Sequence, residues 1–349
     1  MKKSILKSLC MAAVALSAHS CLVENPKLTD DGQLGVDPTE VAVAVDINID
    51  LTIPALEADG ESFAQPATDG TAYKRRVVVE AATDGRLPVK RVMLLDIAAG
   101  QSELSVPVSL RLSARDYTLS VWSDYVQVAD NGTVDSTYFY NVTMLPNVYA
   151  GKSYRGNNAY KDAAFASTRL DLSPYRNGWN ERVVVDLPLQ RPVGRLQLKA
   201  TDTRAFLDRI ASGQIKGESF AVRVSYPGYV CMGYNIAEQL PRHSLMYMTY
   251  DNAFSTKNMT ADEPFLLTFD YLFAESDAIT SVPMQIEILD SSKTTTLASC
   301  SFTANVRAGY CSTIGYGFLT SMDDQGITFD PNFSGNGTIV VVPTPSDNQ

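Results

Sequence analysis

An alternating run near the N-terminal end restricts this chain more than any other feature. From residue 41 to residue 53 every odd position is apolar, and from Asp46 onward the even positions are polar. Because successive side chains of a β-strand point to opposite faces, a period of two predicts one face in a core and one in water. Pro54 ends the run. The first folded part of the chain must therefore contain a sheet.

The remaining sequence repeats short runs rich in Val, Thr and Tyr, with turn residues between them. Such runs predict strands at 77–82, 89–97, 103–112, 116–128, 138–143, 183–189, 193–199, 220–226, 244–250, 265–273, 284–289, 295–306, 313–319 and 338–342. A short helix is expected from an Asp202 cap to Ile210, ended near Gly213. Many short strands with turns between them predict an all-β chain of two sandwiches in series, joined near Gln190.

The first 21 residues match the pattern of an export signal. Three lysines precede a short apolar run, residues 8–16, and small residues lead to Cys21. The run is shorter than the roughly 20 residues that a spanning helix needs, so it is typical of a secretory signal. Cys21 is placed like the lipidated cysteine of a bacterial lipobox. We predict a signal peptide over 1–20, lipidation at Cys21 and a tether over 21–38; the alternative is a secretory signal in which Cys21 has no role.

Composition narrows the class of protein. The formal net charge is −10 and no cluster of Lys and Arg occurs, which argues against nucleic acid as a partner. After Cys21 only Cys231, Cys300 and Cys311 remain, an odd set that does not form a disulfide framework. Cys300 and Cys311 could meet across a hairpin, but we expect buried thiols.

No motif indicates catalysis, a metal or a cofactor. After removal of the signal, His243 is the single histidine, so no His–His metal pair can form, and we expect it in a solvated loop. No Gly-x-Ser-x-Gly or phosphate-binding loop occurs. Residues 130–135 carry oxygen ligands but lack the order of a calcium loop, so they predict a hairpin turn. Two close carboxylates could form a glycosidase site, and sequence cannot place them.

Two further groups each allow two interpretations. The dibasic pair Arg75-Arg76 is either a protease processing site or, as we prefer, a solvated start of a strand. Trp122, Tyr125 and Trp179 could form a platform for sugars, although aromatic residues in a sandwich are more often buried.

A series of short motifs, taken in order, resembles a known family. The motifs are Tyr117-Thr118-Leu119-Ser120-Val121-Trp122-Ser123-Asp124-Tyr125-Val126, Lys161-Asp162-Ala163-Ala164-Phe165-Ala166, Arg191-Pro192-Val193-Gly194-Arg195-Leu196, Tyr226-Pro227-Gly228-Tyr229, Gly233-Tyr234-Asn235 and Ser312-Thr313-Ile314-Gly315-Tyr316-Gly317-Phe318-Leu319-Thr320. The series is similar to the fimbrillin-like lipoproteins of anaerobic Gram-negative bacteria, nearest a sub-family of uncharacterised function related to fimbrial anchor subunits. The resemblance implies two transthyretin-like β-sandwich domains, here 39–190 and 191–349, and a part in pili or surface assemblies.

These inferences combine into one expectation. The chain is predicted to be an outer-membrane lipoprotein, on the cell surface or the periplasmic face, held by lipid on Cys21. It would act as anchor, tip or accessory subunit, bind other fimbrial subunits by strand addition, and be no enzyme. The alternative is a carbohydrate-binding surface lipoprotein. Residues 338–342 are expected to pair within the second domain, because the following tail has two prolines and no apolar side chains for a donor strand.

Overall fold

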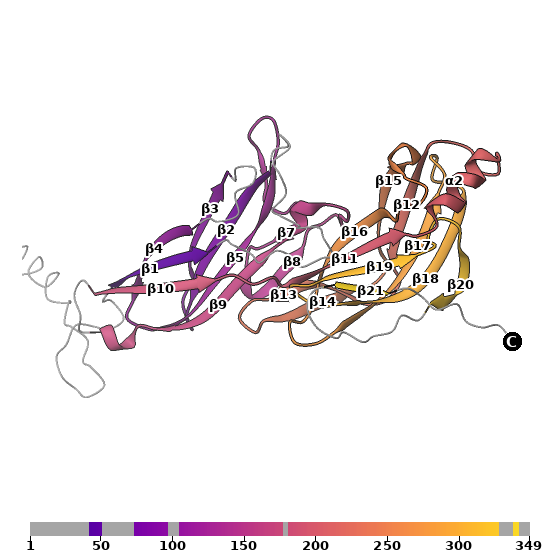
Figure 1. Ribbon diagram of the computed structural model, residues 1–349. Coiled ribbons are helices and arrows are strands. Elements are labelled where there is room, and N and C mark those ends of the chain that lie inside the picture. Colours follow the sequence, from indigo (N-terminus) through magenta and orange to yellow (C-terminus); the bar gives the residue numbers. More distant parts are fainter. Residues whose placement is uncertain (1–41, 51–72, 97–104, 177–180, 328–337, 342–349) are drawn as a thin grey trace, which may run out of the picture. The chain divides into compact units, whose positions relative to one another are not determined.

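The structure is a computed structural model that describes residues 42–50, 73–96, 105–176, 181–327 and 338–341. Before Gln190 the strands are β1 (Ala42–Asp50), β2 (Tyr73–Ala82), β3 (Val89–Leu95), β4 (Ser105–Ser113), β5 (Asp116–Val128), β6 (Val134–Asp135), β7 (Tyr140–Asn141), β8 (Val148–Ala150), β9 (Ala164–Asp171) and β10 (Arg182–Pro188). After it come β11 (Val193–Ala200), β12 (Ser219–Tyr226), β13 (Val230–Asn235), β14 (Leu240–Leu245), β15 (Met248–Ser255), β16 (Phe265–Phe273), β17 (Thr280–Leu289), β18 (Thr296–Val306), β19 (Cys311–Tyr316), β20 (Met322–Ile327) and β21 (Thr338–Val341). The helical elements are α2 (Thr203–Ala211) and the 3-10 turns η1 (Leu145–Asn147), η2 (Ala159–Lys161), η3 (Ser173–Tyr175) and η4 (Thr256–Asn258). The predicted all-β chain with a short helix early in its second half is confirmed (Figure 1).

Strand β1 has the predicted alternation. It is the middle strand of a sheet with the order β10-β1-β4. Val43, Val45, Ile47 and Ile49 are fully buried, whereas the side chains between them are half-buried or exposed. The odd positions therefore form the core face, as the period of two predicts; the predicted ends of this strand, Val41 and residues 51–53, lie outside the described residues.

Strands β2 and β5 form the centre of a second sheet, with the order β3-β2-β5-β6, and β9 pairs with β5. The predicted bounds of β5 are confirmed. Strand β2 begins four residues earlier than predicted, at Tyr73, and so contains Arg75 and Arg76. Both arginines are nearly fully buried, at 1% and 4% exposure. The expected solvated strand start is therefore wrong, because these charges have partners on β5.

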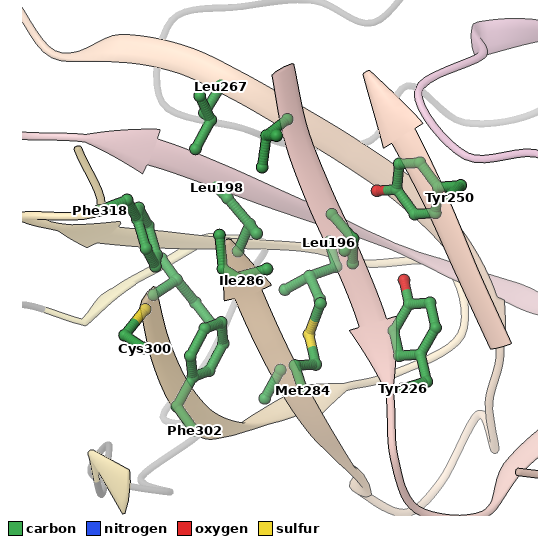
Figure 2. Packing of buried hydrophobic residues seen from close by; sticks show 14 of the residues in the cluster. Leu196, Leu198, Tyr226, Tyr250, Leu267, Met284, Ile286, Cys300, Phe302 and Phe318 are labelled. Carbon is green, nitrogen blue, oxygen red and sulfur yellow. The ribbon is translucent and has the colours of Figure 1, made fainter. Parts of the chain in front are cut away.

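The second half contains a β-sandwich around an apolar core. Its two sheets have the orders β16-β11-β19-β21 and β15-β12-β17-β18-β20. Side chains from both sheets meet in one buried cluster, which Figure 2 shows with Leu196 and Leu198 of β11 beside Met284 and Ile286 of β17. Burial of these faces provides the hydrophobic stabilisation of the sandwich.

A small sheet combines strands from both sides of Gln190. Its order is β14-β13-β8-β7, and Gly233 of β13 pairs with Tyr149 of β8. An aromatic cluster also contains residues from both sides of Gln190. Trp122, Tyr140 and Phe165 pack in it with Tyr234 and Phe273. The described residues on the two sides of the predicted joint thus share one interior.

The chain divides into two compact units. Among the described residues, one unit holds 42–46, 109–117, 170–176 and 181–185, and the other holds the rest. Within the first unit, the Asp46 carboxylate accepts a hydrogen bond from Ser109 Oγ (2.5 Å) and pairs with Arg182. These contacts, with that of Ser109 the larger, lower the pKa of Asp46. The β3 trough, the corner patch and the Lys161–Asp270 pair discussed below lie in the second unit.

The structure corrects several local predictions about strands, a helix cap and buried polar residues. Asp202 precedes helix α2 but does not cap it with its side chain; its carboxylate accepts from Leu319 N (3.2 Å) and Thr320 Oγ1 (2.7 Å) instead. The polar residues Arg195 and Gln197 of the alternating strand β11 are buried, because this strand has a sheet neighbour on each side and side chains over both faces. Strands β8, β9, β13 and β20 were not predicted, and the predicted strand 138–143 is reduced to Tyr140–Asn141.

Candidate functional site

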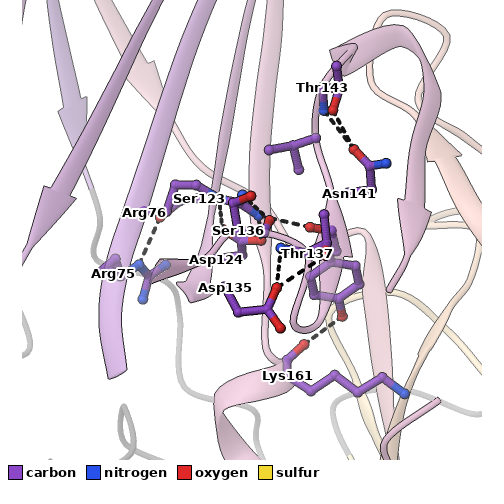
Figure 3. Close-up of polar contacts among 12 residues, drawn as sticks. Arg75, Arg76, Ser123, Asp124, Asp135, Ser136, Thr137, Asn141, Thr143 and Lys161 are labelled. Atoms are coloured by element: carbon purple, nitrogen blue, oxygen red, sulfur yellow. Dashed lines mark hydrogen bonds and ion pairs between the residues drawn. The ribbon is translucent and has the colours of Figure 1, made fainter. Parts of the chain in front are cut away.

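A buried ion pair joins strands β2 and β5 on one face of the second sheet. Arg76 of β2 and Asp124 of β5 are direct cross-strand partners, and Arg76 Nε donates to Asp124 Oδ1 (2.8 Å) while its NH2 group contacts Oδ2. The same guanidinium donates to the carbonyls of Ser136 (2.6 Å) and Tyr140 (3.1 Å) (Figure 3). One arginine therefore binds the 134–143 segment to the sheet. Its charged guanidinium donates both to the carboxylate and to two backbone carbonyls, and such charge-assisted hydrogen bonds are stronger than neutral ones.

Arg75, the preceding residue, makes a second set of polar contacts. Its Nε donates to Ser123 Oγ (2.8 Å), and its NH1 group donates to Tyr125 Oη (3.2 Å). Burial raises the pKa of Tyr125, and the positive charge of Arg75 opposes that rise. Tyr125 is thus a neutral hydrogen-bonding partner inside the fold.

Beside the Arg76–Asp124 pair the described residues leave a hollow on the sheet, which we call the β3 trough. It has a volume of about 460 Å³. Its base is the sheet face made by β2, β3 and β5, and its side is the 134–143 segment. The lining residues are Arg76, Val78, Lys90, Val92, Leu94, Val126, Val134, Ser136, Thr137, Asn141, Val142 and Thr143.

The side of the β3 trough is held in place by local hydrogen bonds. Asn141 Oδ1 accepts from Thr143 N (3.0 Å) and Thr143 Oγ1 (2.7 Å), and Asp135 Oδ1 accepts in the same way from Thr137. Lys90 Nζ donates to the carbonyls of Val142 and Thr143, both at 2.8 Å. These contacts fix the backbone of the segment, so the trough is formed before any ligand arrives.

Strand β3 supplies exposed apolar side chains to the trough. Val92 is 56% exposed and Leu94 is 40% exposed, although both belong to a regular strand. Among the described residues β3 is the outer strand of its sheet, with β2 as its neighbour. An outer strand with exposed apolar residues offers unpaired backbone groups and a hydrophobic contact surface together.

A second exposed apolar region lies where the chain passes from one sheet to another, and we call it the corner patch. It consists of Tyr229, Leu245, Met246 and Tyr247. Val230 pairs with Leu245, and Tyr247 N donates to the carbonyl of Tyr226 (2.9 Å), so the two turns run side by side. Tyr229 and Tyr247 are 69% and 77% exposed.

The structure places most of the residues singled out from the sequence. Trp122 and Tyr125 are buried, so they form no platform for sugars, and Trp179 lies outside the described residues, as does Cys21. His243 is exposed as expected, but it belongs to β14 and contacts Tyr149, with the two rings tilted and their centroids 4.3 Å apart. The 130–135 segment is the hairpin between β5 and β6, as predicted.

The described cysteine and acidic side chains form neither a disulfide nor a metal-binding group. Cys300 and Cys311 are buried free thiols, as expected, and Cys231 is a half-buried free thiol. Within the described ranges no group of three or more His, Cys, Asp or Glu side chains is placed to hold a metal ion. No helix in the described part of the chain is long and apolar enough to cross a membrane.

Sequence reasoning missed the β3 trough and the corner patch. Val92 and Leu94 were assigned to an ordinary strand, and the lack of a covering layer is visible only in the fold. The corner patch had a local signal, because Leu245-Met246-Tyr247 is an apolar run at a turn.

Comparison with known proteins gives a family and a set of solved structures. The model of a family of unknown function (DUF6562) matches residues 38–343. None of the curated proteins matches the chain.

Among solved structures, a fimbrial assembly protein from Parabacteroides distasonis superposes with a TM-score of 0.37 and 11% identity, covering 79% of this chain and 91% of that one. The fimbrial anchor protein Mfa2 from Porphyromonas gingivalis superposes with a TM-score of 0.36 and 10% identity, covering 74% and 82%. Scores of this size say nothing about a site or a ligand.

Proposed function

The chain belongs to DUF6562, a family of unknown function, and within that family we propose that it is an exported envelope lipoprotein of fimbrial type. It would serve as anchor, tip or accessory subunit of a surface assembly, held to the outer membrane by lipid on Cys21. The ordered motifs that resemble fimbrillin-like lipoproteins support this role, and so does the all-β fold with its two exposed apolar surfaces.

The β3 trough carries the proposal. Its base is mainly apolar, with the charged side chains of Arg76 and Lys90 at the boundary to the 134–143 segment, and an unpaired strand edge lies beside it among the described residues. An extended segment of another subunit suits such a surface, because its backbone can pair with β3 while alternate side chains occupy the trough. We infer that the trough receives an apolar strand from a second envelope protein.

The C-terminal strand supports a receiving role over a donating one. Strand β21 pairs in parallel with β19, with Cys311 opposite Thr338 and Ile314 opposite Val341. This pairing confirms the expectation for Thr338–Val341, while Val342 lies outside the described residues. A strand already paired in its own sheet is not available to complete another subunit.

Affinity capture of the full-length chain from native envelopes tests the proposal, with chemical cross-linking before solubilisation. Val92→Glu places a charge in the trough at a site exposed enough to leave folding intact. Val184→Glu is the matched control, because Val184 of β10 is the same residue type on a strand and is 60% exposed.

We expect wild type and Val184→Glu to capture the same envelope protein and Val92→Glu to lose at least nine-tenths of it, roughly the loss that 1.4 kcal/mol of binding energy produces. Equal capture by all three chains would contradict the proposed role of the trough.

Carbohydrate binding has one observation in its favour, the two exposed tyrosines of the corner patch. Exposed aromatic rings can stack on sugars, although Trp122 and Tyr125 are excluded by burial. Glycan binding that is lost in Tyr229→Ser and Tyr247→Ser but kept in Val92→Glu would favour this second function.

A further inference from the structure

Lys161 and Asp270 are two buried, reactive side chains that no proposed binding role uses. Lys161 ends the turn η2, and Asp270 belongs to β16, 109 residues further along the chain. Their side chains are 5% and 2% exposed, and Lys161 Nζ lies 2.7 Å from Asp270 Oδ1. The carbon Cγ is bonded to that oxygen at about 1.2 Å, so nitrogen and carbon are at most about 3.9 Å apart. This is close to the separation of groups ready to react.

The two oxygens of Asp270 have different surroundings. Oδ1 faces the lysine nitrogen and accepts from Tyr271 N (2.8 Å). Oδ2 accepts from two phenols, Tyr154 Oη at 2.5 Å and Tyr226 Oη at 2.8 Å. Burial raises the pKa of both phenols well above the ordinary value, so they stay protonated and can donate. Oδ2 is therefore held by two neutral hydroxyl donors, whereas Oδ1 faces the lysine nitrogen and a backbone N–H.

The lysine is held against the carboxyl group by its surroundings. Its Nζ lies over the ring of Tyr154, 3.9 Å from the ring centroid, and Tyr140 Oη donates to its backbone carbonyl (2.6 Å). Burial lowers the pKa of Lys161, and the negative charge of Asp270 opposes that change. In a site of low polarity, transfer of one proton from the ammonium to the carboxylate removes two buried charges and leaves a neutral amine, which is a nucleophile.

From this geometry we propose that Lys161 and Asp270 join in an intramolecular isopeptide bond that the folded chain makes by itself. The neutral Nζ attacks Cγ, and the negative charge that develops on Oδ2 is stabilised by the two tyrosine hydroxyls. Oδ1 already carries the proton it received from the ammonium, takes a second proton from Nζ and leaves as water. Amine and carboxylic acid become amide and water, with no oxidant, reductant or co-reactant.

The other buried or partly buried ion pairs discussed for the described residues lack one part of this arrangement. The Arg76–Asp124 and Arg191–Asp162 pairs use guanidinium groups, which do not lose a proton in proteins and stay ionic. Lys90 lies 3.3 Å from Glu80 but is 25% exposed, and its Nζ also donates to two carbonyls. Lys90 is therefore partly exposed and shared among several acceptors, and it gives an internal control in the same chain.

The bond would link the segment before β9 to β16, which is the outer strand of its sheet among the described residues. An amide between residues 109 positions apart closes a large loop and restricts the unfolded chain. It would also keep these two parts joined when the chain is pulled, which suits a protein that transmits force between a membrane and an external partner.

Peptide mapping of the full-length wild-type chain tests the proposal directly. The chain is kept folded, then denatured and digested with trypsin, which does not cut after an acylated lysine. We expect one cross-linked species that joins residues 156–169 to residues 258–293 and is lighter than their sum by one water molecule. The chain should still be cut after Lys90. Complete cleavage after Lys161, with no cross-linked species, would overturn the proposal.

Two variants separate the reaction from simple packing. Tyr154→Phe with Tyr226→Phe keeps both rings but removes the donors to Oδ2, so the cross-linked fraction in freshly synthesised chain should form roughly 100-fold more slowly. Lys161→Met should abolish the cross-link completely. A cross-link that forms at the wild-type rate in the double Phe variant would show that the tyrosines play no part.

Discussion

The Arg76–Asp124 pair is the clearest case of a residue whose role depends on one distant partner. Both side chains are buried and the contact is bidentate. Removing one member of a buried pair leaves the other charge without its counter-ion. We therefore expect Asp124→Ala to lower the free energy of unfolding by about 3–5 kcal/mol in urea titrations at neutral pH. Asp262→Ala is the control, because Asp262 and its partner Arg204 are 73% and 60% exposed, and it should change stability little. Similar losses in the two variants would contradict this account.

Buried tyrosines should make stability fall at alkaline pH. Burial, followed by the charge of Asp270, raises the pKa of Tyr226 well above 10.0, its value in the unfolded chain. Above pH 10 the unfolded chain therefore releases a proton that the folded chain retains, so unfolding becomes more favourable as pH rises.

We expect Tyr226→Phe to reduce the slope of this loss by about 1.4 kcal/mol per pH unit between pH 10 and 12. Urea unfolding at several pH values measures the slope. Tyr229→Phe, at an exposed site, should keep the wild-type slope.

Strand β1 gives a test of the alternation at the level of one element. Ile47 is fully buried, whereas its neighbour Asn48 is exposed and donates to Asp186 Oδ1 (2.8 Å). Ile47→Ala should cost roughly 2–4 kcal/mol, from lost transfer energy and the cavity left behind. Asn48→Ser should cost little, because the group it loses is already solvated. Equal shifts of the melting temperature would show that the two faces were assigned wrongly.

Strand β21 tests whether the C-terminal run belongs to its own sheet. Because it covers the edge of β19 in parallel pairing, deletion of residues 338–342 should lower the melting temperature of the isolated chain. Deletion of residues 343–349 should leave it unchanged. The interpretation fails if the chain without 338–342 melts like wild type but no longer binds a second subunit.

At the scale of the molecule, contacts inside the second unit cross the predicted joint at Gln190. Arg191 forms a buried contact with Asp162, and Phe165 pairs with Gln190 through two backbone hydrogen bonds. With the shared aromatic cluster, these contacts mean that the described segments before and after the joint stabilise one another.

Membrane attachment is the property of the whole molecule that Cys21 would determine. An acyl chain contributes about 0.8 kcal/mol for each buried CH₂, so two or more chains hold a folded body firmly. We expect Cys21→Ala to move the protein from membrane to soluble fractions and to remove the acyl mass from its N-terminal peptide. Unchanged fractionation with the same acyl mass would refute lipidation at this residue.

The sequence by itself determined the features that depend on local periodicity. The buried face of β1, the bounds of β5 and the hairpin after it follow from side-chain alternation and turn residues, which act over a few positions. The all-β class follows in the same way, because each short strand carries its own signal.

Only the tertiary structure decided which polar side chains are buried and which apolar ones are exposed. Arg76 looks solvated in the sequence, since Asp124 lies 48 positions away and no spacing rule joins them. Lys161 meets Asp270 only because η2 packs on β16, and Val92 is exposed because none of the described segments covers β3 there. Strands β8 and β13 of the small sheet were missed because they are short and lack alternation. Such contacts are set by chain packing over long sequence separations, and a local pattern carries no information about them.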